Sequence, residues 1–162
     1  MPNLSDKGIY LPPSPIRKLV PYAEQAKRRG IKVYHLNIGQ PDIPTPQVAI
    51  DAVKSVSDKV FCYGHSAGNK SYRDKLVKYY ASVDIDVTAD DMVVTVGGSE
   101  AIFMAMTICM NPGDEVLVPE PFYANYNGFA MEAGVNIKPI SSTIANDFAL
   151  PPMEEFERLI TP

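Results

Sequence analysis

Several features that mark particular classes of protein are scarce in this sequence or missing from it. The chain has two cysteines, two histidines and no tryptophan, and its 15 basic residues are outnumbered by 19 acidic ones, giving a net charge of −4. Nucleic-acid-binding surfaces usually carry excess positive charge, so this balance argues against such a partner. No apolar run approaches the roughly 20 residues that a membrane-spanning helix needs. The first residues show neither a basic nor an apolar stretch, so we expect no secretory signal and a cytoplasmic protein.

The few cysteines and histidines are too scattered to suggest a metal site. Cys62 and Cys109 lie far apart and form no CxxC pair, and His35 and His65 are equally isolated. A zinc site needs about four ligands, usually grouped closely in sequence. We therefore expect no metal, and we interpret both cysteines as buried free thiols.

Proline is abundant, and it divides the start of the chain into short segments. Prolines punctuate residues 12–21 and again residues 41–46. Because proline fixes φ and lacks a backbone donor, these stretches must be extended or turning. Between them, residues 16–29 are predicted to form a helix that ends at Gly30, and residues 32–38 a short strand or extended segment.

From residue 46 onward, helical and strand patterns alternate. Apolar stripes predict helices over 46–56, with Thr45 as N-cap and Pro46 in the first helical position, and over 70–81. The remaining expected elements are strands at 92–96, 116–118 and 135–140, and helices at 100–110, 123–133 and 151–160. Strands separated by helices are typical of a parallel α/β sheet. The helix at 100–110 is apolar nearly all round, so we expect it to be buried on most sides.

A glycine pair between a predicted strand and a predicted helix is the first candidate ligand-binding segment in the sequence. Gly97 and Gly98 allow close approach of a ligand to the backbone, and Ser99 adds a hydroxyl donor. Unpaired N–H groups and the helix dipole favour an anion at such a helix start, so the turn is a candidate phosphate site. A simple strand-to-helix turn is the alternative. The GxGxxG fingerprint and the Lys-Ser/Thr ending of a P-loop are both absent.

Several ordered segments together resemble the N-terminal part of the class I/II aminotransferases, which are pyridoxal-phosphate enzymes with the aspartate aminotransferase fold. The segments are Leu36-Asn37-Ile38-Gly39-Gln40-Pro41-Asp42 with Pro44-Thr45-Pro46, Tyr63 with Gly68, Gly97-Gly98-Ser99-Glu100-Ala101, Pro112-Gly113-Asp114-Glu115-Val116 and Pro119-Glu120-Pro121-Phe122-Tyr123. The resemblance spans nearly the whole chain.

The resemblance implies roles for matching residues around a pyridoxal 5′-phosphate cofactor. Gly98, Ser99 and Glu100 resemble the turn that holds the cofactor phosphate through main-chain amides. Tyr123 resembles the aromatic residue that stacks on the pyridine ring, and flat π systems pack well on one another. An ordinary aromatic at a helix start is the alternative for Tyr123.

Two further positions carry implied roles, and one of them implies a partner. Gly39 resembles the glycine whose backbone contacts the substrate carboxylate. Tyr63 resembles the tyrosine that reaches the phosphate bound by the neighbouring subunit, which implies a homodimer. Simple core or surface packing is the alternative for Tyr63.

The resemblance also implies a fold and a division into domains. We expect a three-layer α/β architecture, a parallel-type sheet with helices on both faces. Residues 1–45 would be an N-terminal arm and a Pro-rich segment of the small domain, and residues 46–162 an incomplete cofactor-binding large domain. The missing sheet partners would leave open edges, so we expect this stretch to be poorly stable alone.

The implied activity is transfer of an amino group between an amino acid and a 2-oxo acid. The lysine that forms a Schiff base with the cofactor has no match here, so we expect an N-terminal fragment that is inactive by itself. Related enzymes perform elimination or decarboxylation, and the sequence does not identify the amino acid. A non-catalytic or regulatory remnant of the fold is the alternative.

A third hypothesis comes from Gly64-His65-Ser66-Ala67-Gly68, which matches the GxSxG nucleophile elbow of serine hydrolases. That class needs a histidine later in the chain than the serine. No histidine follows His65, so the hydrolase is the least favoured reading.

Overall fold

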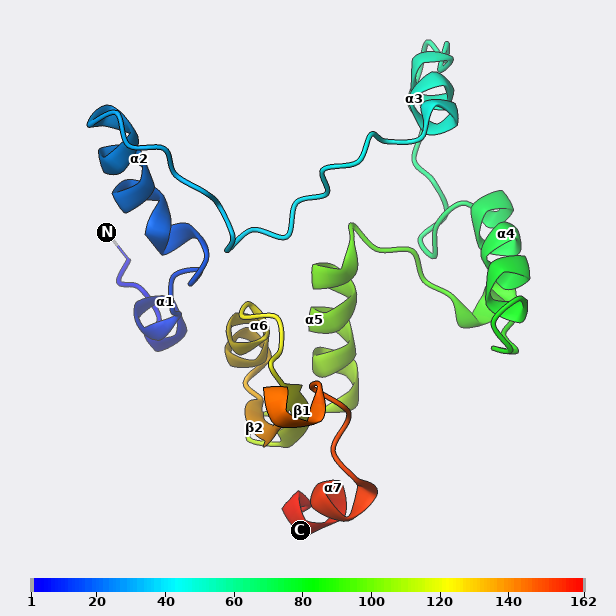
Figure 1. Cartoon of the computed structure of the whole chain (residues 1–162). Coiled ribbons are helices and arrows are strands. Elements are labelled where there is room, and N and C mark those ends of the chain that lie inside the picture. The colour runs from blue at the N-terminus through cyan, green and yellow to red at the C-terminus, as the bar shows by residue number, and fades with distance from the viewer. Residues whose placement is uncertain (1, 162) are drawn as a thin grey trace. The chain divides into compact units, whose positions relative to one another are not determined.

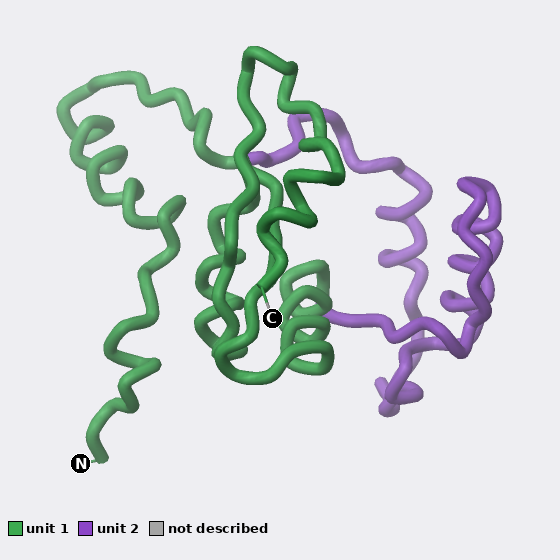
Figure 2. The backbone as a smooth tube through the Cα atoms, turned by 90° about the horizontal axis from the view of Figure 1, so that it is seen from below, with its two compact units in different colours: residues 1–38, 97–162 green, residues 39–96 purple. Residues whose placement is uncertain are grey.

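The computed structural model describes residues 2–161, which fall into two compact units (Figure 2). Residues 1–38 and 97–162 make up the first, which we call the α/β unit, and residues 39–96 make up the second, the helical unit. The predicted domain division between residues 45 and 46 stays a prediction.

The α/β unit contains a parallel pair of strands connected through a helix (Figure 1). β1 (Glu115–Glu120) pairs with β2 (Asn136–Ser141), in register from Glu115 opposite Asn136 to Glu120 opposite Ser141. α6 (Tyr126–Ala133) lies between them in sequence, because parallel neighbours need a crossover. Parallel α/β packing is therefore confirmed, with both strands within two residues of their predicted bounds.

Apolar side chains of α5 (Gly98–Cys109) and α6 form the core of this unit. Met106 of α5, Ala130 of α6 and Val135 before β2 are buried together, and half-buried side chains such as Phe129 and Ile137 surround them. Burial of these apolar side chains is the main contribution to the stability of this unit.

The expectation that the helix at 100–110 is buried on most sides is wrong for the described residues. Met106 is its one buried residue, Ile108 is 76% exposed and Met104 is 38% exposed. One face of α5 packs on α6.

The N-terminal segment of the α/β unit is helical in short pieces. It contains α1 (Asp6–Tyr10), a 3-10 turn η1 (Arg17–Leu19) and α2 (Val20–Arg28). The helix predicted over 16–29 is thus confirmed in its main part, with Pro21 in the first turn of α2, where its missing N–H costs no hydrogen bond. Residues 32–38 form no strand ladder, and residues 36–37 are a turn, so the strand alternative is wrong.

The C-terminal end of the α/β unit holds a 3-10 turn, η3 (Ile144–Asn146), and α7 (Met153–Leu159). The final predicted helix, 151–160, is therefore confirmed. Pro152 takes the N-cap position of α7, with Glu154 and Glu155 in the first turn, where negative charge suits the helix dipole.

The helical unit contains α3 (Gln47–Lys54), α4 (Lys70–Ala81) and a 3-10 turn, η2 (Ala89–Asp91). The bounds of α4 match the prediction, and the Asn69 side chain caps it by accepting a hydrogen bond from the Ser71 N–H at 3.0 Å. The predicted cap of α3 is wrong. Pro46 takes the N-cap position there, and no side chain caps the helix.

The predicted strand at 92–96 is also wrong. This segment is extended but has no strand ladder in the described residues; Val94 N–H donates to the Ala67 carbonyl at 3.0 Å. Gly68 lies against Val94 so closely that a Cβ at Gly68 would be 2.5 Å from the Val94 side chain. Gly68 also has φ +97°, so both its conformation and its surroundings require glycine.

A buried arginine organises the loops around α4. Arg73 is 6% exposed; its Nε donates to the Gly68 carbonyl at 3.3 Å and its Nη1 donates to the Ala89 carbonyl. The Asp90 carboxylate lies 3.7 Å from the guanidinium. Hydrogen bonds and a nearby opposite charge offset the desolvation of a buried charge, and Arg73 has both.

The expectation of buried cysteines is wrong, since both Cys62 and Cys109 are exposed. Across residues 2–161, none of the helices has the length and apolar character needed to cross a bilayer. Within the same range, no three side chains of the metal-binding types cluster as ligands.

Candidate functional site

The glycine turn lies at the start of α5, as the sequence predicts. Gly97 precedes the helix with φ +82° and ψ 174°, a conformation that favours glycine, and Gly98 is the first helical residue. Both are exposed, and a Cβ at either would meet no heavy atom within 4 Å. The space over this turn is therefore open to a ligand.

The chemistry of this turn comes from its backbone. The first N–H groups of a helix have no intrahelical acceptor. Within residues 2–161, no backbone carbonyl accepts a hydrogen bond from the N–H groups of Gly98 and Ser99. The Ser99 hydroxyl adds a donor, and Glu100 completes the exposed first turn. With the positive end of the helix dipole, these donors suit an anion.

Tyr123 lies in the loop between β1 and α6 of the same unit. Its ring is 46% exposed and packs edge-to-face on Tyr126, with centroids 5.8 Å apart and an interplanar angle of 85°. The phenol oxygen accepts a hydrogen bond from Asn125 Nδ2 at 2.6 Å. The helix predicted to begin at Tyr123 begins at Tyr126, because residues 123–126 form a turn closed by the Tyr126 N–H and the Tyr123 carbonyl at 2.9 Å.

The remaining two predicted residues belong to the helical unit. Gly39 lies in the extended stretch before α3, where it is exposed and a Cβ would have no neighbour within 4 Å. Tyr63 is fully exposed. The structure thus brings Gly98, Ser99, Glu100 and Tyr123 into one unit, and it places Gly39 and Tyr63 in the other.

Sequence reasoning missed Asn125. An asparagine directly before a helix is expected to be an N-cap. This expectation accounts for the residue, so the sequence gives no reason to look for another role. Its amide instead contacts Tyr123, and Ser14 Oγ lies 3.5 Å from its Oδ1. The signal that could have indicated this contact is Tyr123, two positions earlier in the sequence.

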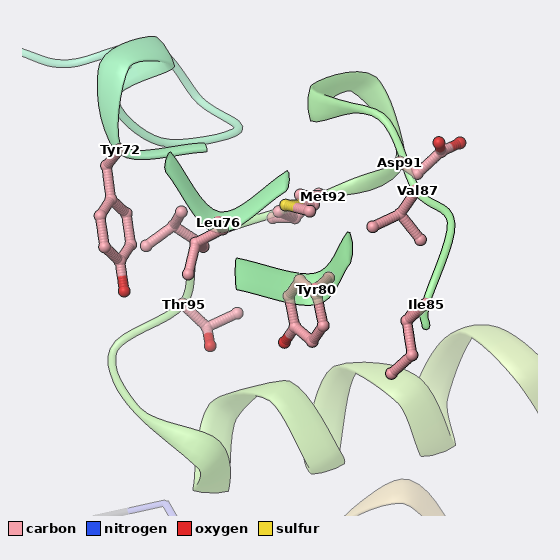
Figure 3. Close-up of a pocket in the computed structure, with 10 residues that line it drawn as sticks. Tyr72, Leu76, Tyr80, Ile85, Val87, Asp91, Met92 and Thr95 are labelled. Carbon is pink, nitrogen blue, oxygen red and sulfur yellow. The ribbon is translucent and has the colours of Figure 1, made fainter. Parts of the chain in front are cut away.

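A groove of about 430 Å³ runs along α4 in the helical unit (Figure 3). Leu76, Ile85 and Val87 are among its apolar lining residues, and no predicted cofactor residue lines it. The Asp91 carboxylate points away from the groove (Figure 3). Hydrogen bonds from the Thr88 hydroxyl (2.6 Å) and N–H (2.8 Å) hold it there and lower its pKa below the ordinary value. The groove therefore lacks the poised charged group expected of a reaction centre.

The structure argues against the serine-hydrolase alternative. A nucleophile elbow joins a strand directly to a helix, whereas residues 60–63 form no strand and α4 begins four positions after Ser66. His65 Nδ1 accepts a hydrogen bond from the Ala67 N–H at 3.1 Å, so this nitrogen is engaged by the backbone.

The parallel strand pair with a helix between its strands defines an α/β protein. Residues 31–162 match the profile of the family described as aminotransferase class I and II. The chain belongs to this family.

Individual relatives agree with this assignment. The chain is 31% identical over 142 residues to a (5-formylfuran-3-yl)methyl phosphate transaminase of Methanocaldococcus jannaschii, covering 86% of this chain and 37% of the relative. It is 29% identical over 164 residues to the aspartate/prephenate aminotransferase of Thermus thermophilus, covering 100% of this chain and 42% of the relative.

Solved structures give the same fold. An alanine aminotransferase from Pyrococcus furiosus superposes with a TM-score of 0.88 at 29% identity, covering 98% of this chain and 41% of that one. The aspartate aminotransferase of Thermotoga maritima gives a TM-score of 0.84 at 29% identity, covering 98% and 42%. The fold is that of the aspartate aminotransferases, and the chain spans about two fifths of the length of the relatives it matches.

Proposed function

We propose that this chain forms the phosphate-binding part of a pyridoxal-phosphate-dependent aminotransferase, which moves an amino group between an amino acid and a 2-oxo acid. The observation that carries the proposal is the open, glycine-lined start of α5. There, Gly97 has a positive φ, and no backbone carbonyl of the described residues accepts from the N–H groups of Gly98 and Ser99.

The donor set of this turn fits the phosphate of the cofactor. The donors we assign to it are the N–H groups of Gly98 and Ser99 and the Ser99 hydroxyl, and Glu100 completes the same first turn of α5. Charge-assisted hydrogen bonds from backbone N–H groups to an anion are short and strong, and the helix dipole adds to them. Because a Cβ would occupy open space at both glycines, close approach of the anion meets no steric barrier.

Tyr123 is assigned to the cofactor ring, against which its flat face would pack. When bound, pyridoxal phosphate supplies an electron-withdrawing ring that stabilises negative charge at the α-carbon of an amino acid. Tyr123 orients that ring, and the α5 turn anchors it at the phosphate. Gly39 is assigned to the substrate carboxylate through its backbone N–H.

The proposal also includes the amine that binds the cofactor and a second subunit. The amine that carries the cofactor is assigned to the rest of the complete enzyme, because no lysine here lies in a matching motif. Tyr63 is fully exposed, which suits a side chain that reaches into the site of a second subunit. We therefore propose a homodimer as the active form.

The test is a titration of the complete enzyme, freed of cofactor, with pyridoxal phosphate and in parallel with pyridoxal, which lacks the phosphate. A visible absorption band of bound cofactor that bleaches when an amino acid is added supports the proposal. Ser99→Ala should weaken binding of pyridoxal phosphate about tenfold, because it removes one hydrogen bond to a charged group.

The unphosphorylated ligand is the matched control, because Ser99→Ala should leave its affinity unchanged. Gly128→Ala is the protein control, since this glycine lies within α6 and a Cβ there meets nothing within 4 Å. A flat visible spectrum, or equal loss of affinity for both ligands, contradicts the proposal.

A further inference from the structure

Asn125 occupies the N-cap position of α6 without capping it. A capping asparagine normally has an extended backbone and accepts a hydrogen bond from the N–H two or three residues on. Asn125 has φ −75° and ψ −11°, which is right-handed helical, and its side chain makes no cap hydrogen bond. The side-chain amide can therefore form hydrogen bonds with other side chains.

Both ends of the Asn125 amide point to neighbours instead. Nδ2 donates to the Tyr123 phenol oxygen at 2.6 Å. Oδ1 lies 3.5 Å from Ser14 Oγ, at the outer limit of a hydrogen bond, and this pair is partly buried. Ser14 comes from the N-terminal segment, so the amide links that segment to the tyrosine.

The aromatic neighbour of Tyr123 restrains the ring from a second direction. Tyr126 lies edge-to-face to Tyr123 at 5.8 Å, and Tyr126 is itself stacked parallel to Phe122, at 6.1 Å and 8°. Edge-to-face packing restrains the tilt of the Tyr123 ring. The hydrogen bond from Asn125 fixes the far end of the phenol, which packing alone leaves mobile.

We propose that Asn125 is a positioning residue that holds the Tyr123 ring in place for the cofactor, and that Ser14 supports Asn125 in turn. This inference rests on the proposed function, in which Tyr123 stacks on pyridoxal phosphate. Because the phenol oxygen accepts from Asn125, its own O–H proton remains available to donate to an acceptor on a bound ligand.

The test is a double-mutant cycle in the complete enzyme, with Asn125→Ala, Tyr123→Phe and the two combined. The readouts are the equilibrium Kd for pyridoxal phosphate and the visible circular dichroism of the bound cofactor, which reports ring orientation. We expect each single variant to raise Kd about 3- to 10-fold, and the double variant to raise it no further, because both remove the same hydrogen bond. Ser14→Ala should raise Kd about twofold.

Asn127→Ala is the matched control, since Asn127 is an exposed residue of the same helix. It should change neither readout, and the thermal midpoint of the cofactor-free Asn125→Ala variant should stay close to that of the wild type. Additive effects of Asn125→Ala and Tyr123→Phe would mean that Asn125 acts only on the helix, and they overturn the inference.

Two other outcomes separate this inference from the proposed function. If Tyr123→Ala weakens cofactor binding and Asn125→Ala does not, the positioning role is overturned and the proposed function stands. If the wild-type enzyme does not bind pyridoxal phosphate, both are overturned together.

Discussion

The two units bury different kinds of side chain. In the α/β unit, Met106, Ala130, Val135 and Ile140 are buried, all within the continuous stretch from α5 to β2. In the helical unit, the buried side chain among the described residues is Arg73, which donates to backbone carbonyls. An apolar core tolerates changes of shape by partial collapse, whereas a hydrogen-bonded arginine depends on the positions of particular atoms. We therefore expect the helical unit to be more sensitive to single substitutions.

The largest effect is expected at Gly68, where the helical unit is most tightly constrained. Gly68→Ala should lower the free energy of unfolding by about 3–4 kcal/mol, since it adds an unfavourable positive φ and overpacks Val94. Urea unfolding of the protein measures the loss, and hydrogen exchange at the Val94 amide localises it.

Gly64→Ala is the control for this substitution. Gly64 has no positive φ, and a Cβ there meets no heavy atom within 4 Å. Its effect should stay within about 0.5 kcal/mol. Similar losses at Gly64 and Gly68 would contradict the proposed constraint.

Arg73→Ala should be next in size, at about 2–3 kcal/mol, because hydrogen bonds to a charged donor are lost and the Gly68 and Ala89 carbonyls lose their partner. The same unfolding experiment measures it. Lys75→Ala, an exposed change on the same helix, serves as the control. An Arg73 variant as stable as the Lys75 variant would remove the contrast between the two units.

In the α/β unit, Met106→Ala should lower stability by about 2 kcal/mol, at the low end for buried methionine because its half-buried surroundings can collapse. Met104→Ala on the same helix, where the side chain is 38% exposed, should have a smaller effect. Thermal unfolding of both variants checks the order. A loss at Met106 larger than that at Gly68 would reverse the proposed ranking.

The smallest effect concerns an exposed carboxylate on β1. Hydrogen bonds from the Thr161 hydroxyl (2.6 Å) and Lys138 Nζ (3.2 Å) lower the pKa of Glu115 below its ordinary value of 4.5. This stabilisation is complete above pH 4.5 and is lost as the pH falls through the lower folded-state pKa. In an NMR titration, Thr161→Val should raise the pKa of Glu115; an unchanged value would show that Thr161 does not hold it.

Local sequence patterns predicted the elements that depend on neighbours along the chain. α4 has Asn69 as a side-chain cap and an uninterrupted helical stripe, and its bounds match the prediction. β1 and β2 are separated by one helix, so their pairing is close to local as well. The patterns failed where partners decide the structure: residues 92–96 have the composition of a strand, but a strand needs a ladder partner.

The candidate site shows the same division. The α5 turn was predictable because two glycines between apolar segments signal a backbone-lined turn by themselves. The Ser14 support of Asn125 was not, because Ser14 lies 111 positions away. A single sequence gives no indication of a contact at that separation.

The N-terminal segment holds α6 at both ends: Ser14 lies next to Asn125 at the start, and Lys7 Nζ donates to the Glu132 carbonyl at 2.7 Å in the last turn. Lys7 and Glu132 are 125 positions apart. During synthesis, this segment therefore leaves the ribosome long before its docking helix exists, and closing so long a loop is entropically unfavourable. Its attachment to α6 must be a late step in the maturation of the nascent chain, after the helix that receives it has emerged.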